Sequence, residues 1–206
     1  FFAETQKKSN LVNKIIDISR TNSLKIRRIL DEKVFQGHKY NGHVPISAIY
    51  AFLGILSAVL YKYSYYVVAN EYSSNFGNIK YKGQIINHQW SKSSEFENLF
   101  QDYVKNFVTP NVHYFSLLRP FYEIRIAELF SKYKKYFSHF SSCNKNFIID
   151  KAEDKNLWCG QCPKCVFVFI LLSVFLSKKE LVGIFKKNLY QEEKLIPLFS
   201  DILGFG

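Results

Sequence analysis

Four cysteines are the residues of this sequence whose type and spacing most strongly indicate a chemical role. Three lie within seven residues and the fourth lies upstream, at positions Cys143, Cys159, Cys162 and Cys165. Thiolates are soft ligands, and four of them give zinc a closed tetrahedral shell with no position left for a substrate. The two-residue gaps let successive thiolates turn around one ion. The pattern therefore predicts one structural zinc ion bound by all four cysteines.

Other interpretations of these cysteines stay open. Disulfides are opposed by the tight spacing and because the sequence shows no secretory feature. An iron–sulfur cluster or free thiols would use the same residues. A catalytic interpretation gives Cys143 and Cys165 a chemical role, since some cofactor-independent racemases place one thiol on each face of the substrate carbon. Metal binding would consume those two thiols.

A polar segment precedes Pro45, where a helix is expected to begin. Asn41, Gly42 and His43 would place free backbone amides at the helix start, where they favour an anion such as phosphate. His43 would add a hydrogen bond. The ordinary interpretation of the same segment is a loop followed by a helix cap.

Three further positions carry groups suited to acid–base chemistry or to anion binding. In segment 87–92, His88 suits proton transfer and Lys92 suits holding an anion, although a single histidine commonly has a structural role. Arg119 follows a predicted strand and suits a bidentate contact with carboxylate or phosphate. Glu71 suits magnesium binding or general-base chemistry.

Alternating helices and strands must position these groups, and the hydrophobic pattern predicts them along the chain. The clearest helix is 95–107, with Ser94 and Glu97 as a capping box at its start. A buried helix from Pro45 to about Tyr61 explains the apolar stretch there better than a membrane span does. Further helices are expected at 11–18, 122–130, 163–176, 180–188 and 195–203, strands at 24–30, 65–69, 112–117 and 136–140, and a hairpin at 79–86.

This alternation predicts an α/β fold with a mostly parallel sheet and helices on both faces. Ligands of such folds gather at the carboxyl ends of the strands. Glu71, Arg119 and Ser141 each follow a predicted strand, so we expect them at one edge of the sheet, with His43 and His88 close by.

The motifs, taken in order from about residue 24 to residue 176, resemble the UDP-N-acetylmuramoyl-L-alanyl-L-glutamate epimerase family. The matching segments are Asn41–Pro45, Asn70–Glu71, Asn87–Lys92, Phe115–Pro120, Ser142–Asn144 and Trp158–Cys165. That family is similar in turn to the PP-loop ATP-pyrophosphatase fold of 7-cyano-7-deazaguanine synthase, whose cysteine pattern looks the same.

The resemblance implies ATP- and magnesium-dependent inversion of the terminal L-glutamate of a peptidoglycan precursor. It implies adenylation of the α-carboxylate, epimerisation of the activated carbon, and hydrolysis. A free carboxylate resists loss of its α-proton because a dianion would form, and activation lowers that barrier without pyridoxal. Within the matching segments, the candidate catalytic residues are Glu71, His88 and Lys92, and the candidate substrate-binding residues are Asn41, Gly42, His43, Asn70, Trp90, Arg119 and Asn144.

One feature departs from the PP-loop pattern, because no Ser-Gly-Gly-type phosphate loop occurs in this sequence. We expect that loop and the first strand to lie upstream, which would leave the chain catalytically incomplete. Residues 1–140 are then a truncated α/β PP-loop-like domain. Residues 141–206 are the zinc knuckle and C-terminal helical region of the same domain.

The formal net charge of +11 indicates an anionic partner, although lysines scattered over the surface explain it equally well. The expected partners are the UDP-N-acetylmuramoyl dipeptide and ATP, with ATP, Mg²⁺ and structural Zn²⁺ as cofactors. We expect a cytoplasmic protein with no membrane span and no nucleic-acid partner. Two alternatives stay open: another PP-loop synthetase resembling 7-cyano-7-deazaguanine synthase, and a zinc-stabilised nucleic-acid-binding module.

Overall fold

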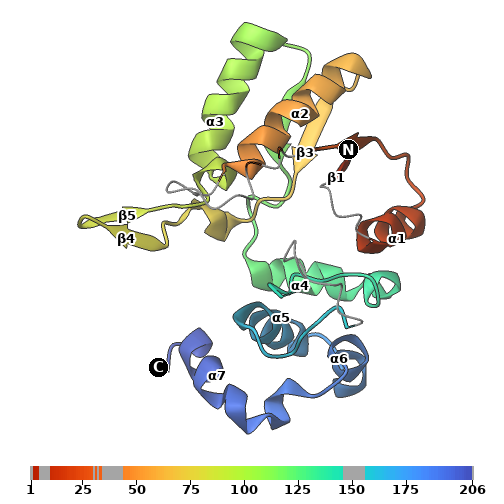
Figure 1. Ribbon diagram of the computed structural model, residues 1–206, viewed down its shortest axis with the longest axis vertical. Coiled ribbons are helices and arrows are strands. Elements are labelled where there is room, and N and C mark those ends of the chain that lie inside the picture. Colours follow the sequence, from red (N-terminus) through yellow and green to blue (C-terminus); the bar gives the residue numbers. More distant parts are fainter. Residues whose placement is uncertain are drawn as a thin grey trace. The chain divides into compact units, whose positions relative to one another are not determined.

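The computed structural model describes residues 2–4, 10–29, 31, 33, 44–145 and 156–205. The chain divides into two compact units, and most of their helices and strands are labelled in Figure 1. The first unit contains residues 1–6 and 24–123, and the second contains residues 7–23 and 124–206. The predicted domain boundary at residue 140 stays a prediction.

The first unit is built on a short parallel sheet with two helices beside it (Figure 1). Strands β3 (Tyr65–Val68) and β6 (His113–Ser116) pair in parallel. Helices α2 (Ile46–Leu60) and α3 (Ser94–Tyr103) pack on this sheet, because their apolar side chains share one core with it. The buried members of that core are Ala51, Ile55, Ala58, Phe96, Phe100, Val104, Val112 and Tyr114.

The other face of the β3–β6 sheet is open in the part of the chain that the structure describes. Successive side chains of a strand point to opposite faces, so Tyr66 and Val68 meet the helices while Tyr65 and Val67 point away. Tyr65 is 65% exposed and Val67 is 44% exposed. The strand predicted at 65–69 is therefore confirmed, but its prediction as a buried strand is wrong for this face.

Two more strand pairs belong to the first unit. The β1–β2 pair is parallel and the β4–β5 pair is antiparallel. Their bounds are Phe2–Glu4, Lys25–Arg27, Ile79–Tyr81 and Gln84–Ile86. The hairpin prediction is confirmed. Lys82 and Gly83 form its turn with φ values of 48° and 81°, as a tight hairpin turn of type I′ requires. The α/β class is also confirmed, although the described strands form three two-stranded sheets and not one.

Gly54 lets helix α2 approach the sheet closely. A Cβ built at Gly54 would overlap the ring of Tyr66, whose hydroxyl donates a 3.2 Å hydrogen bond to the backbone oxygen of Tyr50. That bond and the surrounding core hold the ring in place.

Gly54→Ala is expected to lower the free energy of unfolding by about 2 kcal/mol, because a Cβ that overlaps the Tyr66 ring puts the overpacking cost at the top of its usual range. Overpacking costs about 1–3 kcal/mol, whereas alanine gains about 1 kcal/mol over glycine in helix propensity. Gly183→Ala is a matched control in helix α6, because a Cβ there meets nothing within 4 Å and only the propensity gain should appear. Urea unfolding of both variants checks the opposite signs, and equal shifts would contradict the packing argument.

Helix α3 and its N-cap each lie one residue earlier than predicted. Ser93, not Ser94, is the N-cap, and its hydroxyl accepts a 3.2 Å hydrogen bond from the backbone N–H of Phe96. Glu97 is then one position beyond a capping box, and its carboxylate is used elsewhere. The helix continues in a wider, π-helical turn at Val104–Val108, close to the predicted end.

The second unit is helical. Its helices are α1 (Asn10–Ser19), α4 (Glu123–Ser131), α5 (Pro163–Ser173), α6 (Lys178–Phe185) and α7 (Ile196–Leu203). The core lies around α5, and its largest fully buried side chains include Phe169, Leu172, Phe185 and Leu189. All five helices were predicted within a few residues of these bounds. Within the described residues, no helix combines the length and apolarity needed to cross a membrane.

The strand predicted at 136–140 is wrong. A single 3₁₀ turn covers Lys134–Tyr136, and turns and loop follow it. The ring of Phe130 contacts those of Phe137 and Phe140, with centroids 5.7 and 4.5 Å apart. A strand would send Phe137 and Phe140 to opposite faces, because they are three residues apart, whereas a turn brings both onto one core.

Helix α6 begins with a full capping box. Ser177 accepts from the backbone N–H of Glu180, and the Glu180 carboxylate accepts from the backbone and hydroxyl of Ser177 at 2.9 and 2.8 Å. Lys134 donates to the same carboxylate at 2.6 Å. The hydrogen bond from Lys134 and those from Ser177 lower the pKa of Glu180 to about 2.

Glu180→Gln is expected to reduce the melting temperature at neutral pH and to lose this effect in acid. Because the folded-state pKa lies below the ordinary value of 4.5, the carboxylate stabilises the fold above about pH 4.5. That contribution disappears as the pH falls towards 2. Melting curves of wild type and variant should therefore converge over this range, with Glu193→Gln as an exposed control. Parallel curves down to pH 2 would contradict the prediction.

Candidate functional site

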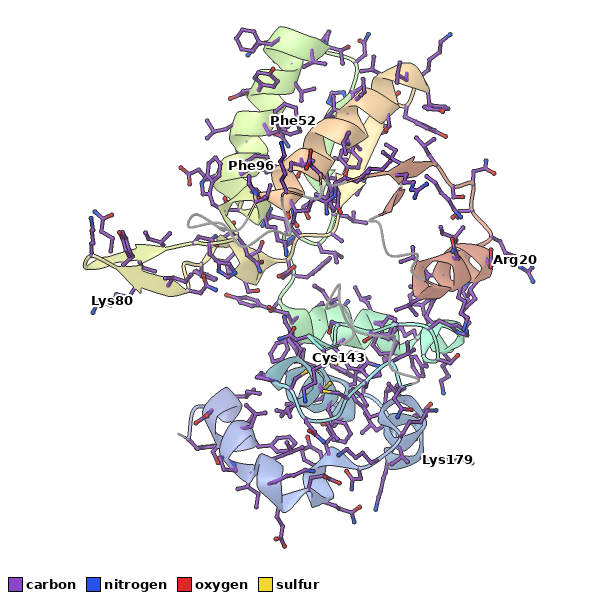
Figure 2. All side chains as sticks on the ribbon, in the orientation of Figure 1. Arg20, Phe52, Lys80, Phe96, Cys143 and Lys179 are labelled. Carbon is purple, nitrogen blue, oxygen red and sulfur yellow. The ribbon has the colours of Figure 1, made fainter. Side chains whose placement is uncertain are left out.

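The four cysteine sulfurs meet in the second unit, as the spacing predicts. All four Sγ atoms lie within 4.8 Å of one another. The separations are 3.9 Å for Cys143–Cys162, 3.7 Å for Cys159–Cys165 and 3.4 Å for Cys162–Cys165. Zn–S bonds of about 2.3 Å in a tetrahedron put sulfurs about 3.8 Å apart. The residues therefore fit a zinc ion, and Figure 2 shows the sulfurs at the label of Cys143, beside α5.

Local backbone structure brings the thiols together. Helix α5 begins at Pro163, so Cys162 precedes the helix and Cys165 lies in its first turn. Gly160 has a φ of 65°, and a Cβ there would come within 2.6 Å of Lys187 Cε. Glycine accordingly permits the turn that aims Cys159 and Cys162 at one point.

Burial and backbone hydrogen bonds act on these thiols in opposite directions. Burial raises the pKa of Cys143 and of Cys165, both of which are 0% exposed. Burial also acts to raise the pKa of Cys162, but hydrogen bonds from the backbone of Cys165 and Asn144, together with those from the thiols of Cys165 and Cys159, outweigh it and lower that pKa to about 7. Four thiolates in this interior need a cation, so the donor set suits a divalent metal that neutralises them.

Asn144 and Ser141 lie in the same unit as the thiols. The side chain of Asn144 is exposed, and its predicted contact with substrate stays a prediction. Ser141 hydroxyl donates to the backbone oxygen of Leu157 and accepts a 3.2 Å hydrogen bond from the N–H of Cys143. Ser141 does not follow a strand, so its predicted place at a strand end is wrong.

The first unit gathers a second polar cluster at the carboxyl ends of β3 and β6. Asn70 and Glu71 follow β3, and Arg119 follows β6. Arg119 Nη1 donates to the backbone oxygen of Glu71 at 3.1 Å, so these two residues share one edge of the sheet, as predicted. The side chain of Asn70 hydrogen-bonds the hydroxyl of Tyr114, whose pKa burial raises to about 12.

Arg119 is extensively hydrogen-bonded within the first unit. Nη1 also donates to Ser74 Oγ at 2.9 Å and to Asn75 Oδ1 at 3.4 Å, and Nη2 donates to the backbone oxygen of Lys92 at 2.8 Å. Nη2 and Nε reach Glu97 Oε2 at 2.8 and 3.3 Å. The predicted contact of Arg119 with a substrate anion stays a prediction.

Glu97 is the residue of this cluster that sequence analysis assigned to another role. The predicted capping box would have used its carboxylate at the helix start. In α3 the buried residues Ser93, Glu97, Phe100 and Val104 form one stripe. A carboxylate on a buried stripe requires a cationic partner. The position of Glu97 on this stripe was therefore the sequence signal that could have predicted its ion pair.

His88, Trp90 and Lys92 lie on the loop between β5 and α3. His88 Nδ1 is 2.6 Å from Asn78 Oδ1, and in the tautomer that donates to this amide oxygen Nε2 is an acceptor. Trp90 Nε1 donates to Glu95 at 2.6 Å, and Lys92 Nζ donates to Gln89 at 3.0 Å.

The structure thus brings the backbones of Glu71 and Lys92 together around Arg119, with His88 on the same loop as Lys92. The segment of Asn41, Gly42 and His43 lies outside the described residues.

Fold and site together define an α/β protein with four thiols that fit a metal ion in one unit and a polar cluster at strand ends in the other. The MurL N-terminal domain model matches residues 4–117, and the MurL C-terminal domain model matches residues 139–206. The chain belongs to the MurL family, which confirms the resemblance seen in the motifs. No solved structure matches the chain.

Curated relatives give the same result. The chain is 40% identical to the UDP-N-acetyl-alpha-D-muramoyl-L-alanyl-L-glutamate epimerase of Xanthomonas oryzae pv. oryzae, over 88% of this chain and 41% of the relative. It is 36% identical to the protein of that name from Micromonospora sp., over 88% and 41%. The relative of the same name in Salinispora tropica is 34% identical, over 88% and 40%. The chain thus spans about two fifths of the length of these relatives.

Proposed function

We propose that the full-length protein carrying this chain converts the terminal L-glutamate of UDP-N-acetylmuramoyl-L-alanyl-L-glutamate to D-glutamate. The observation that carries the proposal is membership of the MurL family. The relatives at 34–40% identity are named as UDP-N-acetyl-alpha-D-muramoyl-L-alanyl-L-glutamate epimerases. Since the chain spans about two fifths of those relatives, the activity is assigned to the whole polypeptide. The reaction would serve peptidoglycan precursor synthesis in the cytoplasm.

The proposed chemistry includes activation of the glutamate α-carboxylate with ATP and Mg²⁺, on a PP-loop fold. Activation removes the negative charge that opposes loss of the α-proton. The sequence of this chain has no Ser-Gly-Gly-type loop, so we assign no ATP contact to its residues. The resemblance of the motifs supports this part of the proposal.

The residues of this chain have separate proposed roles. His88 Nε2 is free to exchange a proton with the substrate carbon, because Asn78 holds the Nδ1 side of the ring. Glu71 is the candidate for a base or magnesium ligand, and Lys92 for an electrostatic contact with the activated carboxylate. Further proposed substrate contacts come from Asn41, Gly42, His43, Asn70, Trp90 and Asn144.

The zinc ion is proposed as structural, held by all four cysteines. It supplies the positive charge that four clustered thiolates, three of them buried, require. With no open coordination position, it takes no part in proton transfer. Its ligands instead fix the loop of Cys143 to the first turn of α5.

A stereochemical assay tests the proposal. The purified full-length protein is incubated with the UDP-linked L-alanyl-L-glutamate, ATP and Mg²⁺. The glutamate is then released by hydrolysis of the peptide, and its enantiomers are resolved by chiral chromatography. We expect D-glutamate to form with ATP present and not in its absence. Release of AMP and pyrophosphate should accompany the reaction. Failure to form D-glutamate under these conditions would overturn the proposed function, and its formation without ATP would overturn the activation step.

A further inference from the structure

The hydrogen-bonding capacity of Arg119 is already used within the first unit. A guanidinium has five N–H donors. Those of Arg119 reach the backbone oxygens of Glu71 and Lys92, the side chains of Ser74 and Asn75, and the Glu97 carboxylate. The Arg119 and Glu97 side chains are only 16% and 11% exposed. An anion held directly by Arg119 would have to displace acceptors that the protein already supplies.

The acceptors belong to two loops, and other hydrogen bonds join the same loops. Ser74 backbone oxygen accepts from Asn87 Nδ2 at 2.8 Å, and Asn75 Oδ1 accepts from the N–H of Ser94 at 2.7 Å. Ser74 hydroxyl lies 3.0 Å from the backbone oxygen of Lys92. Loop 70–76 and loop 87–93 are thereby tied together around the guanidinium.

Glu97 fixes the guanidinium from the helix side. Its Oε1 accepts a 3.1 Å hydrogen bond from the backbone N–H of Ser116, at the end of β6, while Oε2 faces Arg119. Ser116 hydroxyl also donates to the backbone oxygen of Asn70 at 2.6 Å. The carboxylate therefore connects α3 and β6 to the arginine that holds the two loops.

We propose that the Arg119–Glu97 pair is a clasp that positions loops 70–76 and 87–93, and that Arg119 affects the reaction through these loops without touching the substrate. The loops carry Glu71, His88 and Lys92, the candidate catalytic residues. The link to catalysis rests on the proposed function, whereas the holding of the loops does not. Both residues are positioning residues in this account.

Conservative substitutions separate a clasp from a direct anion contact. Lysine keeps the charge of arginine but has no planar fork, so Arg119→Lys cannot serve acceptors on two loops and a helix at once. If residue 119 instead bound a substrate anion directly, the lysine in Arg119→Lys would keep much of that electrostatic attraction. Glu97→Gln removes the charge of a group that the substrate would never meet, while keeping nearly the same shape. Ser74→Ala removes one acceptor of Arg119 together with the hydroxyl's own contacts with the backbone oxygens of Glu71 and Lys92, and leaves the ion pair intact.

The kinetic test uses the full-length protein and measures kcat and KM for epimerisation. We expect Arg119→Lys and Glu97→Gln each to lower kcat by about 10²-fold with KM within about 3-fold, because misplaced groups slow chemistry more than they weaken binding. The double variant should be no slower than the slower single variant, since both break one unit. Ser74→Ala should show a smaller loss of kcat. Arg125→Lys, in the exposed Arg125–Glu128 pair, is the matched control and should match wild type.

Hydrogen exchange provides the second measurement. Amides of 70–76 and 87–93 should exchange faster in Arg119→Lys and Glu97→Gln, while the core of α5 should be unchanged. This comparison also detects a variant that has simply unfolded. If wild type has no epimerase activity, the proposed function fails, and exchange still decides whether the clasp holds the loops.

Two results would overturn the clasp. The first is wild-type kcat in Glu97→Gln together with a raised KM in Arg119→Ala that Arg119→Lys largely restores, which is the behaviour of a direct anion contact. The second is unchanged exchange in both loops when either member of the pair is substituted.

Discussion

Removing the metal from the four-cysteine site is expected to unfold the second unit. Structural zinc contributes about 10–16 kcal/mol of binding free energy in zinc-finger peptides, which is as large as the whole stability of about 5–15 kcal/mol of a typical domain. Cys165 is fully buried beside Val166 and Phe169 in the core, so loss of the ion leaves a buried thiolate there that must take up a proton or become exposed to water. Cys165→Ser should have the same effect as a strong chelator.

Trp158 reports this transition directly. It is 3% exposed, precedes Cys159, and its ring contacts those of Phe140 and Phe185 at 5.1 and 4.8 Å between centroids. Trp90 is 43% exposed, and in a Trp90→Phe background the tryptophan fluorescence of residues 1–206 comes from Trp158 alone. We expect a red shift on chelation and its reversal on adding zinc.

The metal content of freshly purified, reduced protein gives the control. One zinc per chain is expected in wild type and in Ser142→Ala, whose substitution lies beside Cys143 at an exposed position. Less than stoichiometric zinc is expected in Cys165→Ser. Iron with visible absorbance would indicate an iron–sulfur cluster instead. Metal-free protein with an unchanged melting curve would contradict the zinc site altogether.

His88→Ala in the full-length protein is expected to slow epimerisation by about 10²–10⁴-fold, the usual size of a general acid–base contribution. The ring is oriented by Asn78, so its free Nε2 is the group available for proton transfer. ATP-dependent activation, measured as ATP–pyrophosphate exchange, should continue in this variant. Glu71→Ala separates the two roles proposed for Glu71. Loss of a base would stop only epimerisation, whereas loss of a magnesium ligand would also stop ATP-dependent activation.

His139→Ala is the matched control for His88. His139 is half-buried, and its Nδ1 also has a side-chain partner, the hydroxyl of Ser138 at 2.8 Å. Its loss should leave the rate unchanged. Equal effects of the two substitutions would contradict the assignment of His88, and so would full activity of His88→Ala.

Local sequence patterns predicted the elements that depend on local physics. The helix at 95–107 follows from its one-sided apolar spacing, and the hairpin turn follows from a glycine that tolerates positive φ. The prediction of a strand at 136–140 failed because Phe137 and Phe140 both pack against the ring of Phe130, and this tertiary contact is not visible in the local sequence. The prediction that β3 is a buried strand failed for a similar reason. The alternation of side chains shows which of them share a face of the sheet, but it does not show what covers that face.

The candidate site divides in the same way. The thiols were predictable because ligand spacing is a local property of the chain. The edge shared by Glu71 and Arg119 was predictable because parallel strands end together. The ion-pair partner of Arg119 was not predictable. From the local sequence Glu97 is expected to cap a helix, and it pairs with Arg119 only when α3 packs against β6.

Deuterium incorporation is the most direct test of the proposed epimerisation. The full-length protein, loaded with zinc, would act on the UDP-linked L-alanyl-L-glutamate with ATP and Mg²⁺ in heavy water, and the α-position of the product glutamate would be read by mass spectrometry. The account predicts D-glutamate carrying one solvent deuterium at its α-carbon, because inversion requires that proton to leave and be replaced. D-glutamate without deuterium, or folded and metal-loaded protein that forms no D-glutamate, would contradict it.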